Sequence, residues 1–217
     1  MTRLDAARVS ENAARVREEI AAAARRAGRD PAAVELLTAV KYVDVEDVGV
    51  LAEAGLTLLG ENRAQALAAK VAAWPDPALR WHFIGQLQSR KVRQILPLVE
   101  LTHSVASDSS LAQLERHGTA NTEILVEVDV AEEEGKAGIA PAALGEFLAR
   151  ASVCVVGLMA MPPFTEDPEA SRPHFAALRE LASEHGLSQL SMGTSQDFAV
   201  AVEEGATIVR IGSVLFE

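Results

Sequence analysis

Two short apolar segments near the end of the chain each lead into a small polar loop. The loop residues are Gly193, Thr194 and Ser195 after segment 190–192, and Gly212 and Ser213 after segment 206–211. Arg210 lies near the end of the second segment, which predicts a buried strand that carries a charge to the same place. Free backbone N–H groups and hydroxyls of such loops bind phosphate, and Ser195 could cap a helix that starts at Gln196. The two loops therefore predict an anion site.

A lysine ends the first apolar strand candidate. Lys41 follows segment 34–40, and closure of a sheet between the first and last strands would place it near Arg210 and the two loops. Partial burial beside a cation lowers the pKa of a lysine amine and favours Schiff-base chemistry. The structural alternative is a lysine that extends from a strand end into water. The convergence of cation, loops and lysine favours the first interpretation.

Two further polar residues belong to neighbouring strand candidates. Asn62 follows segment 56–59, where it is either a hydrogen-bond donor to a ligand or a helix N-cap, and the residues alone leave both open. His82 shares a strand face with Ile84, and a core histidine bonded to a neighbour is the commoner explanation for that pattern. The five histidines lack metal-ligand spacing, so no metal site is predicted.

Alternating strands and helices must position these residues. The strand candidates are 34–40, 56–59, 80–84, 99–104, 123–129, 152–159, 189–192 and 206–211. The helix candidates between them are 46–54, 62–73, 88–96, 108–117, 141–150, 166–185 and 196–204. A long amphipathic helix precedes the first strand and ends at Gly28. Eight such units predict an α/β fold, a single (β/α)8 TIM-type barrel domain over residues 1–217 with an extra N-terminal helix, in preference to an open doubly wound sheet.

Composition narrows the range of partners. The 217 residues carry a formal net charge of −11, which disfavours nucleic acid and leaves a small ligand as the expected partner. Cys154 is the only cysteine and lies in an apolar run, which predicts a buried free thiol and excludes an intramolecular disulfide. No apolar stretch is long enough to span a bilayer, and the first residues are charged and helix-forming, so a cytoplasmic location is expected.

Several motifs resemble those of the pyridoxal phosphate homeostasis protein family. They are Thr38–Lys41, Gly60–Asn62, Trp81–Gln88, Gly157–Pro163, Ser191–Gly193 and Val209–Gly212, and their order spans nearly the whole chain. The resemblance implies a (β/α)8 barrel similar to the N-terminal domain of alanine racemase. It also implies a protein that binds pyridoxal 5′-phosphate (PLP), has no known turnover, and buffers and delivers the cofactor.

The same resemblance implies roles for individual residues. Lys41 would form the internal aldimine with the cofactor aldehyde, and Arg210 would face the pyridine nitrogen. Asn62 lies where the family has a polar residue near the ring, and His82 belongs to the motif that lines the ring pocket. The phosphate cradle and the residues beside it would be Met192, Gly193, Ser195, Gly212 and Ser213.

The chain is expected to be a carrier without catalytic residues. PLP enzymes normally use a protonated ring nitrogen as an electron sink, and an arginine facing that nitrogen disfavours the proton. Racemases with this arrangement add a tyrosine from a second domain of a partner subunit. The only tyrosine here, Tyr42, should point away from Lys41 in an extended strand end. Tyr42, Val43 and Asp44 also replace the Thr-Lys-Pro type of turn that the family usually has, which puts the shape and charge of that loop in question.

Three functional hypotheses follow for this chain. The first is a monomeric carrier whose partners are PLP and PLP-dependent apoenzymes, and which has little or no turnover. The second is a weak PLP-dependent amino-acid racemase. The third sets the resemblance aside: a Schiff-base aldolase of a phosphorylated sugar would also need a barrel lysine and a phosphate site, and it should purify colourless.

Overall fold

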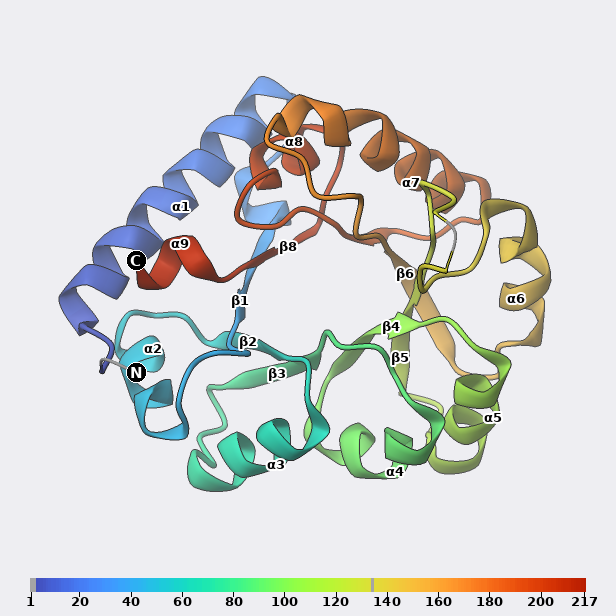
Figure 1. Cartoon of the computed structure of the whole chain (residues 1–217), viewed down its shortest axis with the longest axis horizontal. Coiled ribbons are helices and arrows are strands. Elements are labelled where there is room, and N and C mark those ends of the chain that lie inside the picture. The colour runs from blue at the N-terminus through green and yellow to red at the C-terminus, as the bar shows by residue number, and fades with distance from the viewer. Residues whose placement is uncertain (1–2, 134) are drawn as a thin grey trace.

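Eight parallel strands close into a barrel with helices around it (Figure 1). The computed structural model describes residues 3–133 and 135–217. The strands are β1 Glu35–Ala39, β2 Leu58–Glu61, β3 Arg80–Phe83, β4 Leu101–Val105, β5 Glu123–Glu127, β6 Cys154–Met159, β7 Gln189–Ser191 and β8 Ile208–Ile211. Each strand pairs with the next, and β1 pairs with β8. The predicted closed (β/α)8 barrel is confirmed.

The helices form the outer layer around the strands (Figure 1). They are α1 Ala6–Arg26, α2 Val48–Glu53, α3 Ala64–Ala73, α4 Val92–Ile95, α5 Asp108–His117, α6 Leu144–Arg150, α7 Arg172–Glu184, α8 Phe198–Glu203 and α9 Ser213–Phe216. Short 3₁₀ turns cover Pro31–Ala33, Val45–Asp47, Ser89–Lys91, Leu96–Leu98, Pro141–Ala143 and Pro168–Ser171. The helix expected over 88–96 is therefore three short pieces, the last of which contains Pro97 near its start.

The predicted N-terminal helix covers one side of the barrel. Asp5 caps α1 by accepting hydrogen bonds from the backbone N–H groups of Ala7 and Arg8, and the apolar stripe of α1 is buried. The stripe contacts α8 and α9, and α9 is a helix that the sequence pattern did not predict. The Nε of Arg8 donates to the carbonyl of Glu217 over 2.5 Å, which fastens the last residue to α1.

Apolar side chains pack against both faces of the barrel sheet. The larger cluster lies between strands and helices, and a smaller one lies inside the barrel. The inner cluster consists of Leu37, Leu58, Leu101, Leu125, Met159 and Ile208. Because successive side chains of a strand point to opposite faces, residues two positions further along point into the barrel as well. His103 and Arg210 stand two positions after Leu101 and Ile208 and therefore point into the barrel beyond this cluster, and both are buried, as are His82 and Ser191.

One expectation about the cysteine is wrong. Cys154 is exposed, although it lies in an apolar run. It is the first residue of β6 and pairs with Glu123, the exposed first residue of β5, so its side chain lies at the open amino end of the barrel. Within the described residues, no helix is both long and apolar enough to cross a membrane.

Candidate functional site

The two predicted phosphate loops lie next to each other at the carboxyl ends of β7 and β8. Ser195 does not cap a helix, because α8 begins at Phe198 and Asp197 occupies its N-cap position. Instead the Oγ of Ser195 accepts a hydrogen bond from the backbone N–H of Gly212 over 3.2 Å. This bond joins the first loop to the second. Ser213 is exposed at the start of α9, next to Gly212.

A buried aspartate, which the sequence pattern did not single out, holds the first loop. Asp197 Oδ1 accepts from the backbone N–H of Thr194 at 2.7 Å, and Oδ2 accepts from the hydroxyl of Ser171 at 3.0 Å. The carbonyl of Thr194 accepts in return from the N–H of Asp197. The loop is therefore a closed turn, which keeps Ser195 near Gly212. An Asp three residues after a loop threonine is a local signal for this turn. The contact with Ser171 could not be predicted, because Ser171 is 26 positions away in the sequence.

Gly193 is the residue of this loop that only glycine can fill. Its φ is +89°, and an added Cβ would lie 2.5 Å from the Cβ of Ala201. Its carbonyl accepts from the backbone N–H of Arg210 over 3.0 Å. Gly193 thus lets the loop pass close to α8 while it stays bonded to β8. Met192, one residue earlier, is fully buried in the outer core.

Lys41 lies in a tight turn beyond β1 and is exposed, which corrects the expectation of partial burial. The backbone N–H of Val43 donates to the carbonyl of Val40 over 3.0 Å, so Lys41 and Tyr42 are the central residues of the turn. Strand alternation no longer applies there. The Nζ of Lys41 lies 4.9 Å from the centroid of the Tyr42 ring, so the expectation that Tyr42 points away from Lys41 is wrong.

A buried ion pair supports this turn from below. Lys70 of α3 donates to Glu61 Oε2 over 2.5 Å and to the carbonyl of Val40 over 2.6 Å, and both side chains are at most 3% exposed. Glu61 Oε1 accepts from the backbone N–H groups of Asn62 and Arg63. The pair therefore connects the residue before Lys41 to the end of β2 and to α3. Sequence reasoning missed Lys70, because a lone lysine in a helix is usually at the surface.

Asn62 is not the N-cap of α3, which removes one of its two predicted roles. Helix α3 begins at Ala64, and its N-cap residue Arg63 makes no side-chain capping bond. The Oδ1 of Asn62 is buried and has no hydrogen-bond partner among the described residues. A buried acceptor without a partner is costly, so this atom is a candidate ligand contact.

Arg210 is buried and anchored on three oxygen atoms. Its Nη1 donates to the carbonyl and to the hydroxyl of Ser191 over 2.7 and 2.6 Å, and its Nη2 donates to the carbonyl of Ala160 over 3.0 Å. Among the described residues these bonds leave the Nε hydrogen and one Nη2 hydrogen for another acceptor. Burial lowers the pKa of Arg210 to about 10, and the nearby carboxylates of Glu127 and Asp197 oppose this shift. At neutral pH the guanidinium is therefore still charged.

His82 is a buried histidine bonded to a neighbour, as expected from its strand pattern. Its Nδ1 lies 3.0 Å from Nε2 of His103, and Nδ1 of His103 lies 2.8 Å from the hydroxyl of Ser191. Burial and the cation of Arg80 lower the pKa of His82 to about 3. Burial, His82 and Arg210 hold the pKa of His103 well below its usual range. Both imidazoles are thus neutral in the folded protein, and His103 adjoins Ser191, which anchors Arg210.

We expect neither buried histidine to titrate in the folded protein between about pH 5 and 8. Imidazole signals of His82 and His103 in NMR spectra should stay constant over this range, whereas in the urea-unfolded chain both should titrate near 6.5. Because the unfolded state then binds more protons, the free energy of unfolding should fall as the pH drops from about 6.5 toward about 3. Each histidine contributes a slope of about 1.4 kcal/mol per pH unit. An inflection near pH 6 in the folded protein would contradict this prediction.

Comparison with known proteins identifies relatives over nearly the full length of the chain. The chain is 42% identical over 219 residues to the pyridoxal phosphate homeostasis protein of Aquifex aeolicus, with 95% of this chain and 96% of the relative covered. It is 40% identical to that of Pseudomonas aeruginosa, with 96% and 94% covered. The chain belongs to the pyridoxal phosphate homeostasis protein family. No family model matches the chain.

Solved structures agree with this family assignment. PipY of Synechococcus elongatus, solved with PLP bound, superimposes with a TM-score of 0.79 at 30% identity and covers 96% of this chain and 100% of its own. A lysine/ornithine decarboxylase of Vibrio vulnificus shares the fold alone, with a TM-score of 0.71 at 16% identity, covering 98% of this chain and 62% of its own. This chain thus shares its barrel fold with a decarboxylase whose chain is longer.

The residues that resemble the family motifs lie at two different depths in the barrel. Lys41, Asn62 and the Ser195–Gly212 contact belong to loops at the carboxyl ends of the strands, where barrel enzymes place their sites. His82 lies deeper, within β3, where its Nδ1 contacts Nε2 of His103. In this member of the pyridoxal phosphate homeostasis family, His82 is connected to Arg210 through His103 and Ser191.

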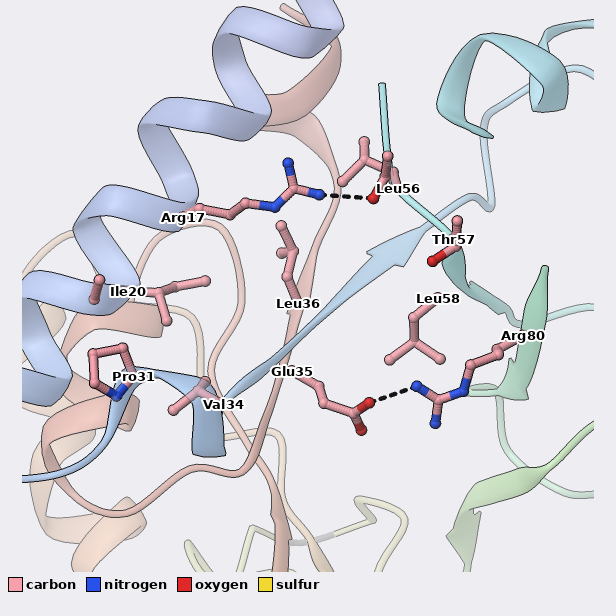
Figure 2. Close-up of a pocket in the computed structure, with 12 residues that line it drawn as sticks. Arg17, Ile20, Pro31, Val34, Glu35, Leu36, Leu56, Thr57, Leu58 and Arg80 are labelled. Atoms are coloured by element: carbon pink, nitrogen blue, oxygen red, sulfur yellow. Dashed lines mark hydrogen bonds and ion pairs between the residues drawn. The ribbon is translucent and has the colours of Figure 1, made fainter. Parts of the chain in front are cut away.

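A separate pocket of about 320 Å³ lies at the opposite, amino end of the barrel (Figure 2). Helix α1 and the starts of β1, β2 and β3 line it, and its two cations point toward partners within it. Arg17 donates to the carbonyl of Gly55 over 2.7 Å, and Arg80 pairs with Glu35 over 2.6 Å. These pairs hold the helix and the strand ends together. The amino end of such a barrel usually serves stability, and this pocket is unrelated to the family motifs.

Proposed function

We propose that this chain binds PLP at the carboxyl end of its barrel, that Lys41 holds the cofactor aldehyde, and that the protein acts in PLP homeostasis and delivery without substantial turnover. The observation that carries the proposal is PipY, which is 30% identical over 96% of this chain and was solved with PLP bound. The two curated relatives at 40–42% identity, named pyridoxal phosphate homeostasis protein, support the same function.

The residues present fit the chemical groups of PLP. The joined loops after β7 and β8 offer hydroxyl and backbone N–H groups for a phosphate, and Ser195, Gly212 and Ser213 would form this cradle beside Met192 and Gly193. Arg210 retains N–H donors for a ring nitrogen, and Oδ1 of Asn62, which has no partner among residues 3–133 and 135–217, is buried close to β2. PLP supplies an aldehyde that condenses with a lysine amine and releases water. Lys41 is the exposed amine that would serve it.

The charge of Arg210 is the main argument for a carrier. A guanidinium beside the pyridine nitrogen disfavours protonation of that nitrogen, which weakens the electron sink that PLP enzymes use. The position of Tyr42 no longer supports this argument, because its ring lies 4.9 Å from the amine of Lys41. A racemisation assay of alanine in heavy water is therefore needed, and exchange at a rate typical of racemases would end the carrier hypothesis.

We further propose PLP-dependent apoenzymes as the recipients of the cofactor, a monomeric state and a cytoplasmic location. A single cysteine, which allows no intramolecular disulfide, suits a reducing compartment. The net charge of −11 favours a solvated surface and disfavours nucleic acid. Sedimentation of the protein with and without a PLP-dependent apoenzyme would measure both its own mass and any complex.

Reduction with borohydride in the presence of PLP should place the label on Lys41. The chain has four lysines, and of the other three Lys70 is buried in an ion pair, while Lys91 and Lys136 lie outside the family motifs. Wild-type protein should show a visible absorption band with PLP, and peptide mapping should find the reduced adduct on Lys41. Lys41→Ala should lose both the band and the label, and Lys91→Ala should keep them.

Two results would count against this assignment. Absence of the band in wild-type protein would remove PLP as the ligand, and scattered labelling of Lys91 and Lys136 would remove Lys41 as its site. In either case the Schiff-base aldolase of a phosphorylated sugar becomes the leading hypothesis, to be tested by borohydride trapping with a phosphorylated sugar in place of PLP.

A further inference from the structure

A continuous hydrogen-bond chain crosses the inside of the barrel from β8 to β3. Nη1 of Arg210 lies 2.6 Å from Oγ of Ser191, which lies 2.8 Å from Nδ1 of His103, and Nε2 of His103 lies 3.0 Å from Nδ1 of His82. Each of the four side chains comes from a different strand, and each is at most 6% exposed. The four side chains contact one another directly, without bridging water.

The arginine end sets the direction of the chain. A guanidinium only donates, so the hydroxyl oxygen of Ser191 accepts from Arg210. Within the part of the chain that the structure describes, the hydroxyl hydrogen of Ser191 then has one acceptor in reach, Nδ1 of His103. If His103 instead donated from Nδ1, this buried hydroxyl hydrogen would have no partner among the described residues, which native structures avoid. His103 therefore carries its proton on Nε2 and donates it to His82.

The His82 end of the hydrogen-bond chain also requires that His103 donates to His82. Nε2 of His82 lies 3.9 Å from Oε2 of Glu100, which also accepts from Nε of Arg80 over 2.8 Å. If Nδ1 of His82 accepts from His103, the proton of His82 is on Nε2 and faces the carboxylate. In the reverse orientation a lone pair would face that carboxylate. The two ends thus agree independently.

We propose that His103 and Ser191 are positioning residues that fix the guanidinium of Arg210 through a one-directional hydrogen-bond chain to His82. The hydrogen-bond chain takes one hydrogen of Nη1 through the hydroxyl of Ser191, and the backbone carbonyl of Ser191 takes the other at 2.7 Å. It therefore determines which hydrogens of Arg210 remain for a ligand. Its existence is a property of the protein alone, and its effect on cofactor binding rests on the proposed function.

The tautomers of the two histidines test the direction of the hydrogen-bond chain without any ligand. Long-range ¹H–¹⁵N NMR spectra of the ¹⁵N-labelled full chain should show both His82 and His103 as neutral Nε2–H tautomers. The reverse chain would show both as Nδ1–H tautomers, and either that pattern or two charged imidazoles would overturn the proposal. The expected pattern would establish the direction but not yet the positioning role.

Two serine variants test the positioning role. Ser191→Ala should shift the ¹⁵N resonance of Nδ1 of His103, which loses its hydroxyl donor, and should weaken PLP binding about tenfold, because a hydrogen bond to a charged group is lost. The matched control is Ser104→Ala, since Ser104 is a buried strand serine whose hydroxyl lies outside the chain, 3.4 Å from the carbonyl of Ile84. It should leave both histidine spectra and the PLP affinity unchanged.

The outcomes separate this proposal from the proposed function. If Ser191→Ala folds and binds PLP as tightly as wild type, the positioning role is refuted even though PLP binding stands. If wild-type protein binds no PLP, the proposed function fails. The tautomers and the response of His103 to Ser191→Ala still show whether the hydrogen-bond chain exists and which way it runs. Should Ser191→Ala fail to fold, Ser191→Thr, which retains the hydroxyl, must keep the Nε2–H tautomer of His103 and the wild-type PLP affinity, and loss of either in the folded variant would refute the positioning role.

Discussion

Replacement of Lys70 by methionine should lower the free energy of unfolding by about 3–5 kcal/mol. The substitution leaves the carboxylate of Glu61, which is fully buried, without its cation, and it removes the donor to the carbonyl of Val40. A buried charge without a partner is among the largest single-residue costs in a folded protein. Urea unfolding followed by circular dichroism measures the loss.

A double-mutant cycle separates the charge from the packing. Glu61→Gln keeps an acceptor for the backbone N–H groups of Asn62 and Arg63, so the double variant Glu61→Gln with Lys70→Met contains no buried charge. It should be more stable than Lys70→Met alone, with a coupling energy of about 1–3 kcal/mol. The control is the exposed pair of Glu18 and Arg25, 2.6 Å apart, where Arg25→Met should cost less than about 1 kcal/mol. Equal losses at the two sites would refute the argument.

Gly193→Ala should cost about 2–4 kcal/mol of the free energy of unfolding. The left-handed backbone at φ +89° accounts for part of the loss. The rest arises because the new Cβ would lie 2.5 Å from Cβ of Ala201 and 3.0 Å from Cα of Phe198, so that α8 or the loop must move. The loop also positions Ser195 next to Gly212 in the proposed phosphate site, so PLP binding should weaken as well as stability.

The matched control is another glycine with a left-handed backbone. Gly186 follows α7 with φ +66°, and an added Cβ there would have nothing within 4 Å. Gly186→Ala should therefore cost only about 1 kcal/mol, the conformational part. Denaturant titration of both variants measures the difference. If the two losses were equal, contact with α8 would contribute nothing and the close approach would not constrain the loop.

Local signals predicted most of the barrel. Helix α5 lies where its pattern places it, at residues 108–117, because a serine N-cap and an apolar stripe are properties of neighbouring residues. The alternation of strands and helices predicted closure, and β1 indeed pairs with β8. Local signals failed for the helix expected over 88–96, which is three short pieces, and at Ser195, whose partner is not a helix end but Gly212.

The sequence by itself determined the eight repeated units, the loops after the last two strands and the family motifs that contain Lys41 and Arg210, because each depends on residues close together in the chain. Tertiary structure decided what supports them. His103 meets Ser191 across 88 positions, and Lys70 reaches Val40 across 30. Such contacts depend on strand register and on which residues point into the barrel, and buried polar groups must find their partners there. No pattern within one segment carries that information.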